Sequence, residues 1–136
     1  MQDALKLWHE LVETRDLTRL DELLAEDCVT HSPIVHSPQR GKAITKLYLT
    51  AAVHVFVSDA FHYVREVTSD RDAVLEFETE IDGIHVNGVD MLRWNEAGQL
   101  VDVKVMLRPL KAINTVHRLM GEMLQKLGGK EAEKAK

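Results

Sequence analysis

The chain has 136 residues, of which 45% are hydrophobic, enough to close one core but too few for two. Its formal net charge of −5 provides no basic surface to attract a phosphate backbone, so we expect no nucleic-acid partner. Cys28 is the single cysteine, which excludes an internal disulfide, and no apolar run approaches the length of a membrane span. We therefore expect one cytoplasmic domain over residues 1–127, a disordered tail over 128–136, no secretory signal and no membrane contact.

Three helices are predicted in the first half of the chain. Over residues 3–14 the apolar side chains recur at helical spacing, and a second, short helix runs from Thr18 to about Glu26, with capping-box spacing at its start. The stretch CVTHSPIVHSP (28–38) combines β-branched residues with two prolines, which favours a short edge strand that breaks into an irregular loop. Gly41 then opens a third amphipathic helix.

After Asp59 the apolar residues alternate with polar ones, which indicates strands. Four such segments follow, and because the connections between them are short we expect an antiparallel meander with one apolar and one charged face. The segments are residues 61–68, 73–81, 85–94 and 100–108. Pro109 then begins a last helix, which keeps helical spacing to about Leu127.

This order of elements predicts an α+β fold. We expect three N-terminal helices on the concave side of a strongly curved antiparallel sheet, with an extra C-terminal helix. A sheet and helices arranged in this way would enclose a cone-shaped cavity.

The order, with the pieces LAEDCVTHSP, RGKAITKLYL and VDMLRWNEAGQLVDVKV, resembles the nuclear-transport-factor-2-like superfamily, which includes ketosteroid isomerases and SnoaL-type polyketide cyclases. The resemblance covers roughly residues 3–108. It implies the same α+β cone, and commonly a homodimer formed through the outer face of the sheet.

Within that superfamily, the strand around Asp90 and the turn NEAG look most like ketosteroid isomerases. The resemblance puts Asp90 on their oxyanion-hole aspartic acid and Tyr48 on a supporting tyrosine. Two positions depart from the pattern, because Ser32 stands at the general-base aspartate and Trp8 at the oxyanion tyrosine. Since a serine cannot serve as the base unaided, we do not expect steroid isomerisation by that mechanism.

Asp90 is the main candidate for a functional side chain. Alternation along the strand turns it inward together with Leu92 and Trp94, and burial among apolar neighbours should raise the pKa of its carboxyl. The competing interpretation is a carboxyl that caps a backbone turn or pairs with an arginine. His36, after Pro33, could supply the missing base, since a histidine pKa lies near neutrality; otherwise it is a surface or dimer-contact residue.

Several large apolar residues could line a pocket for a flat apolar ligand, although each is also compatible with an ordinary core. The predicted lining residues are Trp8, Tyr48, Phe77, Leu92, Trp94, Val103 and Val105. The histidines are dispersed and no metal-binding or phosphate-binding motif occurs, so we expect neither metal nor cofactor. Two functions remain open: a cofactor-free isomerase, cyclase or hydrolase with Asp90 as acid or oxyanion donor, and a non-catalytic ligand-binding or dimerisation module.

Overall fold

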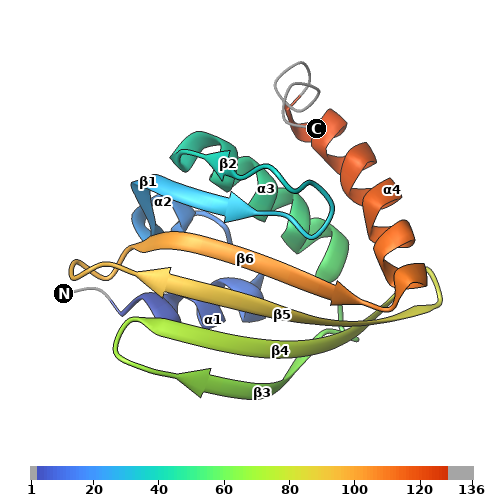
Figure 1. The fold of residues 1–136 in the computed structure, drawn as a ribbon, viewed down its shortest axis with the longest axis horizontal. Coiled ribbons are helices and arrows are strands. Elements are labelled where there is room, and N and C mark those ends of the chain that lie inside the picture. Colours follow the sequence, from blue (N-terminus) through green and yellow to red (C-terminus); the bar gives the residue numbers. More distant parts are fainter. Residues whose placement is uncertain (1–2, 129–136) are drawn as a thin grey trace.

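The structure is a computed structural model and describes residues 3–128. The tail predicted for 128–136 lies outside these residues, except for Gly128, which ends the last helix. The elements in chain order are α1 (Ala4–Thr14), α2 (Leu20–Leu23), β1 (Leu24–His31), β2 (Gln39–Arg40), α3 (Lys42–Phe56), β3 (His62–Thr68), β4 (Asp72–Ile81), β5 (Ile84–Trp94), β6 (Leu100–Arg108) and α4 (Leu110–Gly128). The predicted α+β fold with a curved sheet is confirmed (Figure 1).

The sheet has six strands in the order β2-β1-β6-β5-β4-β3. The predicted meander is confirmed, because β3, β4, β5 and β6 pair antiparallel in sequence order. The first strand differs from the expectation. It is not an edge strand, since β1 pairs parallel with β6 on one side and antiparallel with the two-residue β2 on the other. After the proline-containing loop the chain runs back along β1 as β2, which pairs with Val29 and Thr30.

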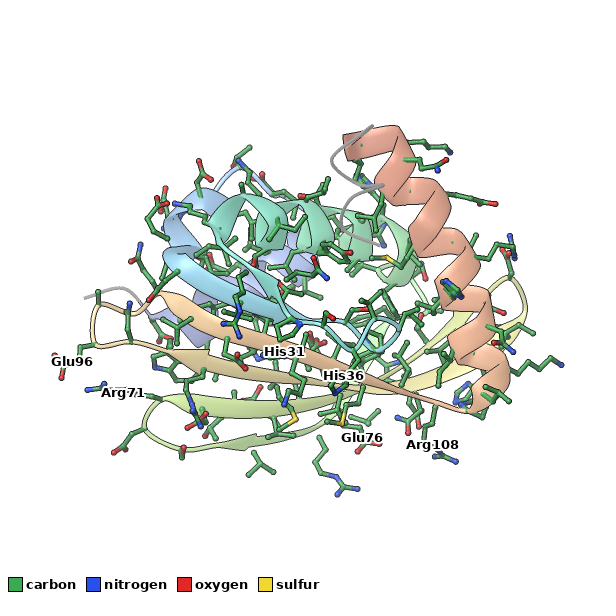
Figure 2. The ribbon with its side chains drawn as sticks, turned by 45° about the horizontal axis from the view of Figure 1, so that its top comes forward. His31, His36, Arg71, Glu76, Glu96 and Arg108 are labelled. Atoms are coloured by element: carbon green, nitrogen blue, oxygen red, sulfur yellow. The ribbon has the colours of Figure 1, made fainter. Side chains whose placement is uncertain are left out.

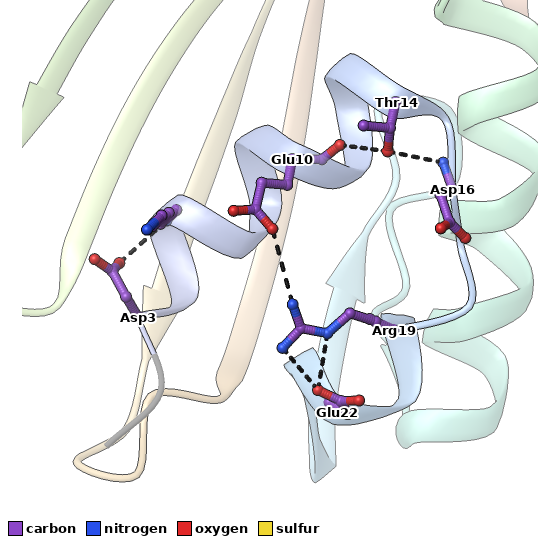
Figure 3. A network of polar contacts seen from close by, with 7 residues as sticks. Asp3, Glu10, Thr14, Asp16, Arg19 and Glu22 are labelled. Atoms are coloured by element: carbon purple, nitrogen blue, oxygen red, sulfur yellow. Dashed lines mark hydrogen bonds and ion pairs between the residues drawn. The ribbon is translucent and has the colours of Figure 1, made fainter.

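The second helix is shorter than expected and lacks the predicted capping box. The backbone N–H of Thr18 donates to Oδ1 of Asp16 at 3.0 Å, which holds the chain in a turn instead of beginning a helix at Thr18. The single turn of α2 begins at Leu20 and stops at Leu23 because β1 starts at the next residue. Arg19 joins Glu22 on this turn to Glu10 on α1, at 3.0 and 3.8 Å (Figure 3).

The side chains buried on the inner face of the sheet form two main clusters. In the first, α1 packs Leu7 and Leu11 against Leu75 and Leu92 of the sheet. In the second, α3 and α4 pack on the far ends of β4 and β5, with members Phe56, Phe77, Ile81, Val86, Ala112 and Val116. The helices therefore close the two ends of the same concave face, and α4 lies beside α3 (Figure 1).

A glycine makes room for one of the core aromatic rings. Gly88 on β5 lies opposite Phe77 on β4. A Cβ on Gly88 would overlap Cζ of Phe77 and come within 2.8 Å of Cδ2 of Leu107. The absent side chain allows the Phe77 ring to lie over the backbone of β5.

The outer face of the sheet is only partly charged. Cross-strand ion pairs join Arg93 to Asp72 at 2.8 Å and Arg65 to Glu76 at 3.2 Å. Between them runs an apolar row that the sequence pattern did not predict. Its members lie opposite one another on three neighbouring strands. They are Val67, which is 58% exposed, and Val74 and Met91, which are each 36% exposed. Within residues 3–128, no helix is long and apolar enough to cross a membrane.

Candidate functional site

A small cavity of about 70 Å³, which we call the inner cavity, lies on the concave side of the sheet. Asp90 reaches it from the middle of β5, where it is paired with Leu75 on one side and Val105 on the other. The other lining residues come from α1, α2, α3, β3, β4, β6 and the segments after α1 and α3: Trp8, Leu11, Val12, Leu17, Leu20, Leu49, Ala52, Val53, Phe56, Val57, Phe61, Tyr63, Phe77 and Val105. The prediction that Asp90 points inward is therefore met by the geometry.

A chain of two hydrogen bonds ends at Asp90. The indole Nε1 of Trp8 lies 2.9 Å from the hydroxyl of Tyr63, and that hydroxyl lies 2.7 Å from Oδ2 of Asp90. An indole N–H can only donate, so the Tyr63 oxygen accepts from Trp8. The Tyr63 hydroxyl in turn donates to Oδ2 of Asp90. In this arrangement Oδ2 is occupied as an acceptor, and Oδ1 is the oxygen of Asp90 that is left to carry a proton.

The buried position of Asp90 allows its carboxyl to be protonated near neutral pH. Its side chain is buried, with 8% of the residue surface accessible. Burial raises the pKa of Asp90 to about 7, while the Tyr63 hydrogen bond and the charge of His9 act in the opposite direction. The pKa of Tyr63 is raised well above its ordinary value, first by burial and then by Asp90. Tyr63 therefore stays neutral and remains a donor.

Tyr63 is the residue that sequence reasoning missed. Its ring packs edge-on against His9 at 5.4 Å between centroids, and His9 Nε2 lies 2.6 Å from Oε1 of Glu66. Tyr63 pairs with Phe77 across β3 and β4, so it shares the inner face with a residue that the alternation had already turned inward. A strand register would have revealed it, but that register contains an irregularity between Tyr63 and Arg65 that alternation alone cannot predict.

A larger, open pocket of about 610 Å³, which we call the outer pocket, lies between α3, α4 and the loop after β1. It shares four lining residues with the inner cavity: Leu49, Ala52, Phe56 and Val105. Tyr48 lines the outer pocket and not the inner cavity. The hydroxyl that donates to Asp90 at 2.7 Å belongs to Tyr63. The supporting role that the resemblance gave to Tyr48 stays a prediction.

The two predicted base positions do not join Asp90 in the inner cavity. Ser32 lines the outer pocket, where its Oγ accepts from the backbone N–H groups of Ile34 and Val35 at 3.0 and 3.3 Å. His36 lies on the loop after β1 (Figure 2) and lines a separate pocket together with Ser32 and Lys104. Their assignment as proton acceptors stays a prediction.

The predicted pocket residues divide into three groups, of which Tyr48 in the outer pocket is one. Trp8, Phe77 and Val105 line the inner cavity together with Asp90. Leu92 and Val103 lie instead in the core cluster under α1, and Trp94 packs against that cluster. Leu92 and Val103 do not reach the inner cavity because they pair with each other nearer the end of the sheet that α1 covers. There the side chains of α1 fill the space above them. Their assignment as ligand contacts stays a prediction.

The described residues offer no ready metal centre. Among residues 3–128, no three His, Cys, Asp or Glu side chains are grouped so that they could hold a metal ion. The histidines that have acidic partners form simple pairs. An example is His31 (Figure 2), whose Nε2 lies 2.8 Å from Oδ1 of Asp102. Cys28 is buried, and burial raises the pKa of its thiol to about 11, which keeps it in the unreactive protonated form.

The fold is that of the nuclear-transport-factor-2-like superfamily, a cone of helices on a curved sheet. Residues 5–103 match the family model of the SnoaL-like domain, and the chain belongs to that family. No curated protein matches the chain in sequence.

Solved structures agree with this assignment. A steroid delta-isomerase from Pseudomonas aeruginosa is 35% identical, with 90% of each chain covered and a TM-score of 0.85. An uncharacterised protein with a cystatin-like fold from Silicibacter pomeroyi is 28% identical over 90% of this chain and 85% of the other, with a TM-score of 0.81. An NTF2-like protein of unknown function from Mesorhizobium loti shares the fold alone, at 18% identity over 78% of this chain and 88% of the other and a TM-score of 0.68.

Proposed function

We propose that the protein binds a small apolar compound whose oxygen enters the inner cavity and accepts a hydrogen bond from Asp90. The observation that carries this proposal is the chain from Trp8 through Tyr63 to Asp90, because it leaves Oδ1 as the oxygen that holds the proton. The surrounding wall is apolar apart from this chain. The inner cavity holds about 70 Å³, less than half of the roughly 150 Å³ of a cavity that binds benzene. It therefore suits the carbonyl end of a compound whose apolar body lies in the adjoining outer pocket.

In catalysis the same geometry would make Asp90 the acid or oxyanion donor of a cofactor-free isomerase, cyclase or hydrolase. A carboxyl kept neutral in an apolar site can donate to an oxygen on which negative charge develops, and a dry wall strengthens that bond. Tyr63 orients the carboxyl, and Trp8 orients Tyr63. With a pKa of about 7, part of the Asp90 population is also ionised at neutral pH and could accept a proton itself.

The activity named for the Pseudomonas aeruginosa relative is not part of this proposal. The position that the resemblance assigns to the isomerases' base is Ser32, whose Oγ accepts two backbone hydrogen bonds within its own turn. The inner cavity has two titratable lining residues among those described, Tyr63 and Asp90. Any reaction here would use Asp90, or water near Ser32, in place of a second carboxylate. Non-catalytic binding of the same ligand is the alternative.

Acetophenone is a suitable probe, because its carbonyl oxygen accepts hydrogen bonds and its body is apolar. Its affinity should fall as the pH rises through about 7, since Asp90 then loses the proton it donates. Asp90→Asn keeps an N–H donor of the same shape, so it should bind acetophenone without that pH dependence. Asp90→Leu removes the donor and should lose most of the affinity. Equal affinity of Asp90→Leu and the wild-type chain, measured by calorimetry, would exclude the donor role.

We also propose that a second copy of the chain covers the outer face of the sheet. Val67, Val74 and Met91 form one exposed apolar row across β3, β4 and β5. On β6 Lys104 stands opposite Met91, and Met106, two residues further along, is 52% exposed. A flat row of this kind on several strands is an unusual surface to leave in water.

Light scattering at micromolar concentration tests the dimer. Met91→Glu should convert a dimer into a monomer, because it places a charge in the apolar row. Leu110→Glu is the matched control, since Leu110 is 71% exposed but stands at the start of α4 and is not part of the row. A monomeric mass for the wild-type chain would overturn the proposal. The cytoplasmic location stays a prediction from the sequence.

A further inference from the structure

Two consecutive residues of α1 hold Tyr63, the hydrogen-bond partner of Asp90. Trp8 donates to the Tyr63 hydroxyl, and His9 packs edge-on against the Tyr63 ring at 5.4 Å between centroids. Nε2 of His9 in turn lies 2.6 Å from Oε1 of Glu66, which stands on β3 together with Tyr63. Tyr63 is thus held at its hydroxyl and at its ring, and Glu66 holds the residue that contacts the ring.

An irregularity in β3 brings Glu66 to the same face of the sheet as Tyr63. On a regular strand, residues three apart point to opposite faces. The register of β3 shifts by one residue between Tyr63 and Arg65. As a result Tyr63 lies opposite Phe77, and Glu66 lies opposite Leu75. Phe77 and Leu75 are both buried on the inner face. The irregularity therefore directs the Glu66 carboxylate toward His9, in the way that bulges redirect side chains beside functional sites.

His9 is accessible to water, whereas Asp90 is buried. The His9 side chain is 36% exposed and lines a pocket of about 390 Å³, which we call the side pocket. The side pocket and the inner cavity share four lining residues: Val12, Val57, Phe61 and Tyr63. His9 lines the side pocket alone and Asp90 lines the inner cavity alone. His9 can therefore exchange a proton with solvent on one side of Tyr63 while Asp90 stays buried on the other.

The other charged groups of the side pocket are paired, exposed or turned away from the inner cavity. Among the described residues they are Glu13, Arg15, Asp59 and His62. Arg15 and Asp59 pair with each other at 3.0 Å. Alternation turns His62 to the outer face of β3. Glu13 is exposed, so water and salt screen its charge. His9 is therefore the group of this pocket that is best placed to act on the buried carboxyl.

We propose that His9 is a positioning residue for Asp90: Glu66 holds the His9 ring against Tyr63, and the positive charge of His9 favours the ionised form of the Asp90 carboxyl. The inference rests on the proposed function, since it concerns the same hydrogen-bond donor. In its support, the charge of His9 lowers the pKa of Asp90, in opposition to burial. Without that charge Asp90 would stay protonated to higher pH and would still donate there. His9 thus sets the upper pH limit of ligand binding.

Carbon-13 NMR of the Asp90 carboxyl in three variants tests this role. His9→Phe keeps a ring against Tyr63 but removes the charge, so the pKa of Asp90 should rise by about half a pH unit or more. His9→Lys keeps a charge but removes the ring, so the pKa of Asp90 should stay at or below its wild-type value. His62→Gln is the matched control and should leave that pKa unchanged, because His62 lines the same pocket but lies 3.9 Å from Glu78 on the outer face. The pH at which acetophenone affinity falls should move with the pKa of Asp90 in each variant.

The contact with Glu66 has a separate readout. Glu66→Ala should release the His9 ring, so the ring-current shifts that His9 and Tyr63 impose on each other should shrink in the proton NMR spectrum. Unchanged ring-current shifts would show that Glu66 does not hold the ring, and would overturn that part of the proposal.

The outcomes separate this inference from the proposed function. If the pKa of Asp90 does not rise in His9→Phe, or rises equally in His9→Phe and His9→Lys, the charge of His9 does not act on Asp90 and the inference is overturned. Binding of acetophenone that depends on Asp90 would still uphold the proposed function in that case. If the pKa of Asp90 changes as expected but acetophenone does not bind, the proposed function is overturned and the effect of His9 on Asp90 stands.

Discussion

Asp90→Asn should stabilise the protein at neutral and higher pH. An ordinary aspartate has a pKa of 3.8, and burial raises the pKa of Asp90 to about 7. The difference of about three units corresponds to roughly 4 kcal/mol, at about 1.4 kcal/mol for each unit. Between about pH 4 and pH 7 the folded chain keeps a proton that the unfolded chain has released, so the free energy of unfolding falls as the pH rises through this window.

Urea denaturation of the two proteins at a series of pH values measures this effect. The other carboxylates titrate in both proteins, so the difference between their free energies of unfolding isolates Asp90. That difference should be small and constant below about pH 4, grow in favour of Asp90→Asn through the window by up to about 4 kcal/mol, and level off above about pH 7. Asn keeps an oxygen to accept from Tyr63, so the hydrogen-bond chain survives. A difference that does not change with pH would refute the claim that the buried carboxyl is hard to ionise.

Two further substitutions test the surroundings of Asp90. Tyr63→Phe removes the hydrogen bond that lowers the pKa of Asp90, so carbon-13 NMR should show that pKa higher still, and urea denaturation should show a loss of about 1–3 kcal/mol because Trp8 Nε1 loses its acceptor. Gly88→Ala would press a methyl group into the Phe77 ring, so we expect a loss of about 1–3 kcal/mol in the same assay; a variant as stable as wild type would contradict the packing described for Phe77.

The sequence predicted most of the fold because the information needed was local. Alternation over residues 61–108 marked the four strands of the meander, and the short turns between them fixed their antiparallel pairing. The same alternation turned Asp90 inward. It failed at α2 and β1, where the pairing depends on contacts between distant segments: the parallel pairing of β1 with β6 cannot be read from either strand alone.

The site was predicted less completely for a related reason. Asp90 stands out in its own strand, but its partner Tyr63 comes from a strand two places away in the sheet and Trp8 from the first helix. Neither residue looks unusual in its own segment, so only the assembled sheet reveals the chain of hydrogen bonds. The resemblance to ketosteroid isomerases pointed to Tyr48 instead, which the fold places in the outer pocket. The outer pocket itself depends on the packing of α4 against α3, which periodicity does not predict.

The most direct test of the central claim is the pKa of Asp90, measured by carbon-13 NMR of its carboxyl carbon with and without acetophenone. We predict a pKa of about 7 for the free protein. Acetophenone should raise it further, because the ketone oxygen accepts a hydrogen bond from the protonated carboxyl and is repelled by the carboxylate. A carboxyl that titrates near its ordinary pKa of about 4, or one whose pKa is unchanged by saturating acetophenone, would contradict the account.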